Sequence, residues 1–381
     1  MQILYLNFNS VANRVLGFAE GMAALGHSPT VIAVSRTARF VPKWTRSSGV
    51  LRGEMPNFPK RYLGYGPIDM LLRVAHIQTH HYDVIHTIDH KPNSYGCGYL
   101  GKRRNTIFIN DWLDLWNTEG GLNTLHAHRF PLLYGLEAKW ERESKLRADG
   151  VVTISQYLRD RAIQMGCDPH RVICLPNGCE TDGLPFIDVA TARKELNVPP
   201  ERKMMGYLGM GINESEMHML MHTLQILPDV WLMVIGPPNP RWQALATTYG
   251  VLDRLWLTGF VDDDKVHSYM SCANVAVVTL ATHAASQARL AGKLMSYMIA
   301  GRPTVTTPIG DTARVIVENK MGLAAEPDQY AQAVQLLLDN PSMATELGRN
   351  ARTIAETTFS NQHLAKLLAT FYETLQASKR N

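Results

Sequence analysis

The chain has 381 residues, of which 45% are hydrophobic and 19% charged, and its formal net charge is +4. This is the composition of a soluble globular protein that is long enough for two domains, each with its own core. No apolar run approaches the ~20 residues that a membrane span needs, which argues against a transmembrane protein. The first seven residues are too short for the apolar part of a signal peptide, so we expect a cytoplasmic protein.

The cysteines indicate a reducing compartment. There are five, an odd number, and none of them forms a Cys-x-x-Cys pair. We therefore expect reduced thiols, with neither a disulfide framework nor a zinc site.

Residues 1–34 have the pattern of a β-α-β unit. A short apolar run at residues 3–6 is followed by an amphipathic segment at 11–25 and by a second apolar run at 30–34. Such a unit is typical of a parallel sheet. The loop at residues 7–13 lacks the glycine-rich fingerprint of dinucleotide-binding proteins, which argues against a nicotinamide enzyme.

Basic residues are concentrated between Arg36 and Arg104, a stretch with 12 Lys and Arg but only 4 Asp and Glu. Residues 36–68 are rich in Pro, Gly and Arg and predict a long loop. Within that loop, residues 39–46 mix cations with aromatic side chains, which suits an anionic membrane surface or an acidic acceptor. A solvated loop would explain the same composition. No nucleic-acid-binding module accompanies the charge, so we expect no nucleic-acid partner.

Polar side chains follow the next two predicted strands, at residues 83–86 and 106–109. His86 ends the first strand, and Asn110 and Asp111 follow the second. The carboxyl ends of parallel strands are where α/β sheets bind ligands, so we expect these side chains to face a ligand.

Aromatic side chains accompany this carboxylate. Asp111 is followed by Trp112 and Trp116, and an acid beside aromatic rings suits sugar recognition. The structural alternative is a loop that two buried Trp residues hold in place. A metal site at the nearby pair His126 and His128, followed by Arg129, has little support from so short a spacing.

The chain then passes through a predicted helix at residues 137–147 and a predicted strand at 148–155 to a segment with many helix breakers. Residues 181–202 hold Asp, Gly and Pro around one short predicted helix at 189–196, which is the pattern of a linker between domains. A second β/α series follows. Its predicted strands lie at residues 204–208, 231–235, 255–258, 275–278 and 304–306.

The loop at residues 209–216 is a candidate phosphate-binding loop. Gly209 and Gly211 would let the backbone approach a phosphate closely. The loop contains no cation, and its two Glu residues would repel a diphosphate. Arg289 and Lys293 supply cations from elsewhere in the sequence.

We expect residues 282–291 to form a loop. The segment that follows predicts a helix that leads directly into a strand. Residues 293–300 place apolar side chains on one helical face, Gly301 can take a left-handed cap, and Pro303 cannot continue the helix. A helix that starts after a loop in an open α/β sheet can bind phosphate at its first turn. An ordinary crossover helix with a basic first turn explains the same pattern.

Residues 262–264 are three consecutive Asp residues that resemble an Asp-x-Asp metal motif. They precede a predicted helix, where capping and a negative first turn explain them without a metal. We therefore expect no metal site.

The run from Lys293 to Thr306 resembles the K-L-x-E-Y-M-A-x-G-x-P-V-V signature of the retaining glycosyltransferases of family 4. Residues 148–180 closely resemble the end of the N-terminal domain in that family, and residues 347–372 resemble its closing helices. The resemblance implies an α/β protein with the GT-B fold. That fold has two doubly wound, Rossmann-like domains that face a cleft, and its C-terminal helices cross back to the first domain.

The implied domain boundaries follow the same motifs. Residues 1–180 would form an acceptor-binding domain, 181–202 the linker and 203–360 a domain that binds a nucleotide sugar. Residues 361–381 would form a helix that packs back on the first domain.

The chain departs from the family pattern at several positions. The family usually carries Glu-x7-Glu where this chain has Ala288 and Ser296, and the second Glu normally binds the ribose of the donor. A His-Asp pair is usual where this chain has Asn110 and Asp111. The first loop lacks the usual Gly-Gly pair, and the loop after Gly209 lacks the usual Arg and Lys.

The resemblance implies a glycosyltransferase that moves a sugar from a nucleotide-sugar donor to a glycan or lipid-linked acceptor. It further implies retention of configuration, no metal and no cofactor. The products would belong to cell-surface polysaccharide or glycolipid synthesis at the inner face of the membrane. The alternative is a catalytically silent relative that acts as a binding or partner subunit, which the missing carboxylates would explain.

These arguments assign three groups of residues. As catalytic residues we expect Asp111, Arg289 and Lys293. The expected donor-binding residues are Gly209, Gly211, Gly259, Phe260, Val261, Arg289, Gly292, Lys293 and Ser296. The expected acceptor-binding residues are Asn9, His86, Asn110, Asp111 and Trp112.

Overall fold

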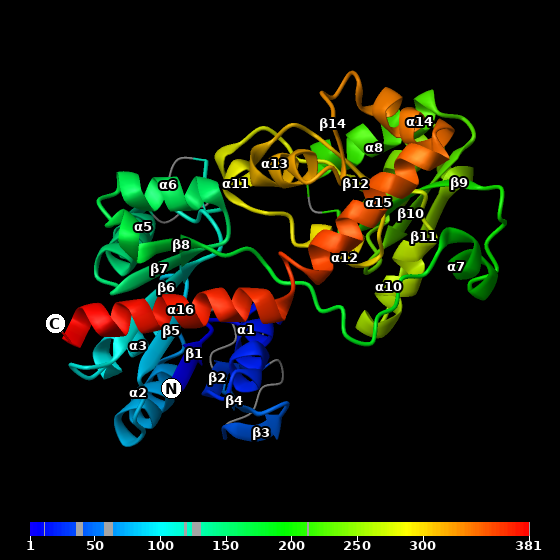
Figure 1. Cartoon of the computed structure of the whole chain (residues 1–381). Helices are drawn as coiled ribbons and strands as arrows, with labels where there is room; N and C mark the ends of the chain where they lie inside the picture. The colour runs from blue at the N-terminus through cyan, green and yellow to red at the C-terminus, as the bar shows by residue number, and fades with distance from the viewer. Residues whose placement is uncertain are drawn as a thin grey trace. The chain divides into compact units, whose positions relative to one another are not determined.

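The computed structural model describes residues 1–10, 12–35, 41–56, 64–117, 120–123, 131–211 and 213–380. Two compact units divide the chain. The first consists of Met1–Gly178 with Asn361–Asn381, and the second of Cys179–Ser360. Both are drawn in Figure 1, and each is described here by itself.

The first unit is built on an eight-stranded sheet with the order β3-β4-β2-β1-β5-β6-β7-β8. Its strands are β1 (Gln2–Leu6), β2 (Ser28–Val34), β3 (Lys43–Ser47), β4 (Val50–Met55), β5 (Val84–Ile88), β6 (Ile107–Trp112), β7 (Gly150–Thr153) and β8 (Val172–Cys174). Its α-helices are α1 (Asn13–Ala24), α2 (Pro67–Thr79), α3 (Cys97–Gly101), α5 (Pro131–Leu146), α6 (Gln156–Gln164) and α16 (Asn361–Arg380), with helical turns η1 (Pro92–Gly96) and η2 (Pro169–Arg171).

Alternate side chains of β1 point to opposite faces of this sheet, as its strand geometry requires. Ile3 and Tyr5 join the core beneath α1 and α16, whereas Leu4 and Leu6 join the core beneath α2 and α3. Helices therefore cover both faces, which is the arrangement of a parallel sheet buried on both sides.

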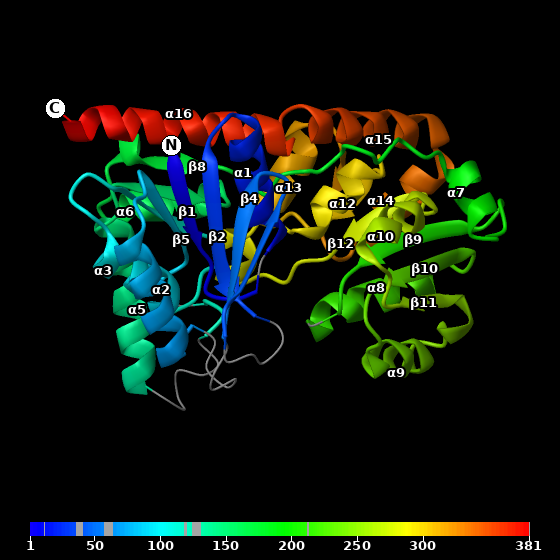
Figure 2. The ribbon, with the colours of Figure 1, turned by 90° about the horizontal axis from the view of Figure 1, so that it is seen from below.

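The C-terminal helix α16 is part of the first unit, as we expected. Leu368 and Tyr372 pack in the same core as β1 and α1, and Figure 2 shows α16 running alongside α1. At Gly17 and Gly21 of α1 a Cβ atom would collide with Asn361 and Ala365 of α16, so these glycines allow the close approach of the two helices.

Residues 36–68 do not form one long loop as we predicted. They contain β3 and β4, and β4 pairs in parallel with β2 while β3 pairs antiparallel with β4. Ser48 and Gly49 form the two-residue hairpin turn between them and both have positive φ, as a type I′ turn requires. The strand β3 was missed because all its residues are exposed and it lacks an apolar face.

The second unit is built on a six-stranded parallel sheet with the order β11-β10-β9-β12-β13-β14. Its strands are β9 (Lys203–Leu208), β10 (Val230–Ile235), β11 (Leu255–Gly259), β12 (Val275–Val278), β13 (Thr304–Thr306) and β14 (Gly322–Ala324). Its helices are α7 (Val189–Glu195), α8 (Glu214–Ile226), α9 (Pro240–Thr248), α10 (Asp263–Ser271), α11 (Ala284–Ala288), α12 (Lys293–Ile299), α13 (Gly310–Glu318), α14 (Tyr330–Asp339) and α15 (Pro341–Glu356), with the turn η3 (Leu252–Arg254).

In order of sequence, the strands of the second sheet are arranged 3-2-1-4-5-6, which is the order of dinucleotide-binding α/β folds. The order reverses between β9 and β12. In such sheets the crevice at the carboxyl ends of the two strands on either side of the reversal is where ligands bind. The first unit has the same reversal between β1 and β5.

The predicted end of the helix at residues 293–300 is confirmed. Gly301 ends α12 with a φ of +62°, and its missing Cβ leaves room for the Phe186 ring. Elsewhere in this unit, Met204, Met205 and Met217 are fully buried in the core.

Two other predictions for this unit need correction. The predicted linker is not a separate segment, because Ala192 and Val198 pack in the core of the second unit. The predicted loop at 282–291 contains the short helix α11, whose first turn is capped by the ring of His283 accepting the N–H of Ser286.

Among the helices of the described residues, none is both long enough and apolar enough to cross a membrane.

Candidate functional site

At the carboxyl edge of the second sheet, the loop after β9 lies close to the backbone at the ends of β10 and β11. Gly209 has a φ of +137° and Gly211 a φ of +64°. A Cβ at Gly236, after β10, would lie 2.5 Å from the carbonyl oxygen of Gly209, and Gly236 itself donates to the carbonyl of Gly259. Gly209, Gly236 and Gly259 therefore line the ends of β9, β10 and β11 with backbone, as close approach of a phosphate requires.

Lys293 reaches this loop from the first turn of α12. Its ammonium lies 3.6 Å from the centroid of the Tyr207 ring, and a Cβ at Gly209 would lie 3.5 Å from Nζ. Burial lowers the pKa of Lys293 to about 7, although the nearby Glu216 raises it and Arg289 lowers it further. The structure thus brings together Gly209 and Lys293, which the sequence assigned to one site.

Arg289 and Glu216 form an ion pair beside Lys293. Nη2 of Arg289 lies 3.7 Å from Oε1 of Glu216, whose side chain is almost fully buried. Burial raises the pKa of Glu216, and the charges of Arg289 and Lys293 act against that rise. Two cations and one carboxylate therefore meet at the carboxyl end of β9.

The other predicted donor-binding residues occupy different environments. Phe260 is 75% exposed at the carboxyl end of β11, and Val261 packs on the core of the unit. Gly292 is exposed and Ser296 is half-buried, whereas Ala288 is fully buried.

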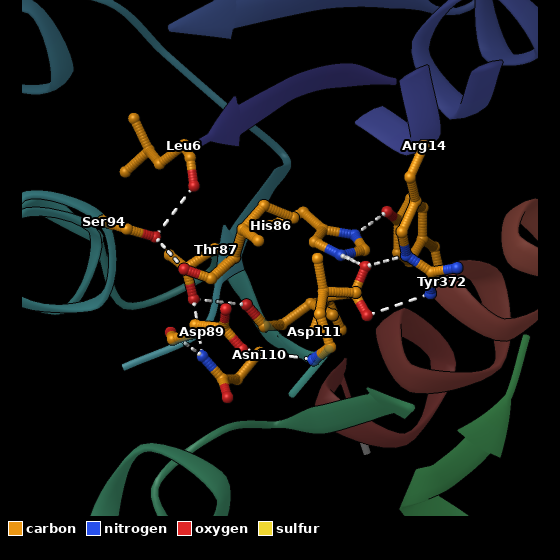
Figure 3. A network of polar contacts seen from close by, with 12 residues as sticks. Leu6, Arg14, His86, Thr87, Asp89, Ser94, Asn110, Asp111 and Tyr372 are labelled. Atoms are coloured by element: carbon orange, nitrogen blue, oxygen red, sulfur yellow. Dashed lines mark hydrogen bonds and ion pairs between the residues drawn. The ribbon is translucent and has the colours of Figure 1, made fainter. Parts of the chain in front are cut away.

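In the first unit, Asp111 is fully buried in a network of polar contacts (Figure 3). Arg14 of α1 donates from Nε to Oδ2 at 2.8 Å and from Nη2 to Oδ1 at 3.0 Å. Nε2 of His86 lies 3.4 Å from Oδ2, and Nδ1 of His86 lies 2.5 Å from the hydroxyl of Tyr372. Burial would raise the pKa of Asp111, but Arg14 and His86 outweigh it and hold that pKa below its usual value.

This burial changes the interpretation of Asp111 and His86. We expected both side chains to face a ligand, but in this structure their polar atoms contact other parts of the first unit. The sequence could not reveal this, because the partner cation Arg14 lies far from Asp111 along the chain. Here Asp111 of β6 pairs with Arg14 of α1 and His86 of β5, and His86 in turn contacts Tyr372 of α16. Asp111 is fully buried.

Asn110 holds the backbone of the neighbouring strand end. Its Nδ2 donates to the carbonyl of Asp89 at 2.7 Å and to Oγ1 of Thr87 at 3.1 Å. Asp89 has a φ of +54°, and its Oδ1 accepts the N–H of Leu113 at 3.1 Å. Burial, together with Asp114, raises the pKa of Asp89 to about 7, against the lowering effect of Lys145.

Lys145 of α5 belongs to the same buried group. Its ammonium lies 4.5 Å from the centroid of the Trp112 ring, and burial lowers its pKa. Among the described residues, Nζ of Lys145, Oδ2 of Asp89 and Oδ1 of Asn110 have no hydrogen-bond partner. The end of this sheet therefore holds polar atoms with unused hydrogen-bonding capacity.

Of the five predicted acceptor-binding residues, only Asn9 is exposed. Its Oδ1 accepts the N–H of Ser10 at 2.8 Å. Trp112 is fully buried and donates from Nε1 to the carbonyl of Asp114 and to Glu141. Trp112 is thus buried as the structural alternative expected, but it lies at the end of β6 instead of in a loop, and Trp116 is only half-buried.

Comparison with known proteins decides the family. Residues 11–182 match the family model of Glycosyltransferase Family 4, and residues 202–340 match that of Glycosyl transferases group 1. The chain belongs to these glycosyltransferases.

The curated relatives are distant. The 2-deoxystreptamine glucosyltransferase of Streptomyces kanamyceticus is 22% identical over 68% of this chain and 68% of its own length. The alpha-D-kanosaminyltransferase of the same organism is 23% identical over 62% of this chain and 64% of its own length. The match thus spans slightly less than two thirds of the second relative.

Solved structures of glycosyltransferases share the fold along almost the whole chain. The sucrose-phosphate synthase of Thermosynechococcus elongatus has a TM-score of 0.80 at 19% identity, covering 99% of this chain and 100% of that one. HepE of Anabaena, solved in complex with UDP and glucose, has a TM-score of 0.72 at 15% identity, covering 98% and 100%. The predicted α/β fold class, with two Rossmann-like units of the GT-B type, is confirmed.

In this glycosyltransferase the sequence missed the position of Glu216. We expected it only to repel a diphosphate, yet its carboxylate pairs with one of the two cations assigned to the donor. The spacing of residues 216, 289 and 293 carries no signal of this contact.

Two sequence motifs were considered as metal sites, residues 262–264 and the pair of His126 and His128. In the described ranges, no three His, Cys, Asp or Glu side chains are grouped so that they could hold a metal ion. Asp262 lies at the start of α10, 3.9 Å from Nζ of Lys265. His126, His128 and Arg129 lie outside the described residues, as do Arg39 and Phe40 of the basic aromatic segment.

Proposed function

We propose that the chain transfers a sugar from a nucleotide-sugar donor, bound on the second unit, to a glycan or lipid-linked acceptor bound on the first. The observation that carries the donor assignment is the loop at Gly209 with Lys293 and Arg289 beside it, at the point where the strand order reverses. Sites of this kind in α/β sheets bind phosphates. The fold neighbour HepE was solved with UDP and with UDP-glucose, which supports a nucleotide sugar as donor.

In this proposal Arg289 and Lys293 bind the diphosphate and stabilise the charge that develops on it when the glycosidic bond breaks. Fixed cations in a partly desolvated site stabilise such charge strongly, because they need little reorganisation during the reaction. No metal ion is required for this role, and we infer a metal-independent transfer. Retention of configuration rests on the resemblance to family 4.

The missing carboxylates bear on how tightly the donor is held. Ser296 stands where the family has a ribose-binding Glu, and Ala288 stands where it has a second Glu near the transferred sugar. Replacing a charged hydrogen bond by a weaker one costs about 1.5–3 kcal/mol. We infer a donor that is bound more weakly or that differs in its sugar, with Phe260 and its neighbours Gly259 and Val261 next to the nucleobase.

The acceptor would bind at the carboxyl ends of β1, β5 and β6. Asn9 is exposed, whereas the buried residues Asn110 and Asp111 bind other groups of the first unit, so we infer that they support the strand ends instead of contacting the acceptor. The basic composition of residues 36–104 suits an acidic glycan or a lipid-linked acceptor at an anionic membrane surface. We infer that the chain works in cell-surface polysaccharide or glycolipid synthesis in the cytoplasm, at the inner face of the membrane.

A thermal-shift panel tests the donor assignment. UDP, GDP, ADP and their sugar conjugates are added to wild type and to Lys293→Ala, with Lys265→Ala on α10 as the control because its side chain is exposed. A ligand that binds only the folded state raises Tm. We expect one nucleotide to raise Tm of wild type and of the control but not of Lys293→Ala. If no nucleotide shifts wild type, the donor site is wrong, and a catalytically silent partner subunit becomes the better interpretation.

A further inference from the structure

Glu216 is a buried carboxylate placed where the proposed function needs an anion to bind. It is the third residue of α8, only 7% exposed, and Oε1 has no hydrogen-bond partner among the described residues. The carboxylate forms an ion pair with Nη2 of Arg289 at 3.7 Å, and the backbone N–H of Ala281 donates a hydrogen bond to the carboxyl group. An ionised carboxylate is buried only when nearby charge compensates it, so Glu216 depends on the cations of this site.

The backbone around Glu216 is fixed, which limits how far the side chain can withdraw. Oγ1 of Thr279, at the end of β12, donates to the carbonyl of Glu216 at 3.2 Å. The start of α8 is capped by Asn213, whose side chain accepts the N–H of Ser215. The main chain that carries Glu216 is therefore fixed beside the phosphate loop by two elements of the fold.

We propose that Glu216 is the counter-ion of the phosphate site in the unliganded protein. A nucleoside diphosphate would displace it from Arg289 and Lys293, and the carboxyl group would take up a proton from solvent as the diphosphate binds. This inference rests on the proposed function, because it assumes that the site at Lys293 receives a diphosphate.

Electrostatics gives the reason for the proton. The charged and titratable groups that face Glu216 are Arg289 from the segment after α11, Lys293 from α12 and Tyr207 from β9. In the unliganded protein this carboxylate partly balances Arg289 and the partly protonated Lys293. A diphosphate brings at least two further negative charges to the same cations, and like charges at short range in a partly desolvated site cannot all stay ionised. Burial already raises the pKa of Glu216, so protonation of this carboxyl removes part of the excess negative charge at low cost.

The same argument explains why the carboxylate is tolerated in a diphosphate site. Without it, the charges of Arg289 and Lys293 would repel each other in the unliganded protein with no anion to compensate them. With it, the net charge of the unliganded site is closer to zero. When the donor binds, its diphosphate takes the place of the carboxylate beside the cations. Glu216 would then weaken the binding of any diphosphate while it stabilises the unliganded protein.

Isothermal titration calorimetry tests this inference. The titrant is the nucleoside diphosphate that the thermal-shift panel selects, taken here to be UDP. Titrations at one pH in two buffers of different ionisation enthalpy give both Kd and the number of protons taken up. The proteins are wild type, Glu216→Gln and Glu214→Gln. Glu214 is the matched control, since it lies on the same helix with its side chain 63% exposed.

We expect Glu216→Gln to bind UDP about tenfold more tightly than wild type, because a like charge next to the phosphates is gone. We also expect it to take up fewer protons, whereas Glu214→Gln should match wild type in both quantities. Lys293 can also take up a proton when the diphosphate binds. In Lys293→Arg the side chain stays charged, so the proton uptake that remains in this variant belongs to Glu216. If Glu216→Gln does not fold, Glu216→Ala removes the same charge and replaces it in the titration.

The outcomes separate this inference from the proposed function. If a diphosphate binds wild type and Glu216→Gln with equal affinity and equal proton uptake, Glu216 is not the counter-ion and only this inference fails. If Glu216→Gln binds more weakly, the carboxylate contacts the donor favourably and the inference is again overturned. If no diphosphate binds wild type at all, the proposed function fails and this inference fails with it.

Discussion

The ammonium of Lys293 lies 3.6 Å from the centroid of the Tyr207 ring, at the carboxyl end of β9. The ring attracts the cation, but it also excludes water from it, and loss of hydration disfavours the charged form of a lysine. Burial accordingly lowers the pKa of Lys293 to about 7, with Glu216 acting against this change and Arg289 adding to it. In the empty site this lysine is therefore charged only part of the time at neutral pH.

The affinity for a nucleoside diphosphate should fall as pH rises above 7. The protonated lysine is the form that binds phosphate, and a bound anion raises its pKa, so binding takes up a proton between the two pKa values. Linkage gives a loss of up to about tenfold in affinity per pH unit across that range. In Lys293→Arg the cation persists at every pH, and Kd measured from pH 6 to 9 should change much less. A slope that is equal in wild type and Lys293→Arg would show that another group titrates.

The pair of Arg14 and Asp111 should be a large contributor to the stability of the first unit. Both side chains are buried and joined by two hydrogen bonds, and removal of one partner leaves the other charge uncompensated. We expect Asp111→Asn to lower the free energy of unfolding by about 3–5 kcal/mol. Urea denaturation measures this, with Glu20→Gln as the control, because the pair of Glu20 with Arg52 is partly exposed and should contribute about 1 kcal/mol or less. Equal losses in the two variants would contradict the structural role.

The pH dependence of stability follows from the same pair. Arg14 and His86 outweigh burial and lower the pKa of Asp111 in the folded state. The stability that this carboxylate supplies is thus fully present above its unfolded pKa of about 3.9 and is lost as pH falls through the lowered folded value. Asp111→Asn should lose less stability than wild type between pH 5 and 2.

How much the sequence predicts depends on the range of the interactions. Five of the six strands of the second unit follow from local periodicity, and Gly301 ends α12 as expected, but β14 and the short helix α11 were not predicted. The strand β3 was missed because its charged, exposed residues carry no signal of the hairpin. The burial of Asp111 and the position of Glu216 depend on Arg14 and Arg289, which approach them only in the folded chain. Sequence reasoning thus located the strand ends that carry polar groups, but it could not tell which of those groups are already paired.

The helix α16 offers a matched pair of adjacent leucines. Leu368 is fully buried in the core of the first unit, whereas Leu367 is 40% exposed. Leu368→Ala should lower the free energy of unfolding by about 2–5 kcal/mol, since it removes buried methyl groups and leaves a cavity. Leu367→Ala on the same helix should cost far less. Chemical denaturation distinguishes them, and similar losses would mean that α16 does not pack on the first unit through this face.

Gly211 should be needed both for stability and for nucleotide binding, and Gly250 provides the control. Both have positive φ, +64° and +66°, so alanine at either position adds backbone strain of about 1–2 kcal/mol. A Cβ at Gly250 meets nothing within 4 Å, whereas a Cβ at Gly211 would lie 2.7 Å from the Trp242 ring. Gly211→Ala should therefore lower Tm more than Gly250→Ala, by an additional overpacking cost of about 1–3 kcal/mol. It should also weaken UDP binding, because relief of the clash displaces the loop beside Lys293. If both variants lose the same Tm and bind UDP like wild type, the loop at 209–211 does not form the phosphate site.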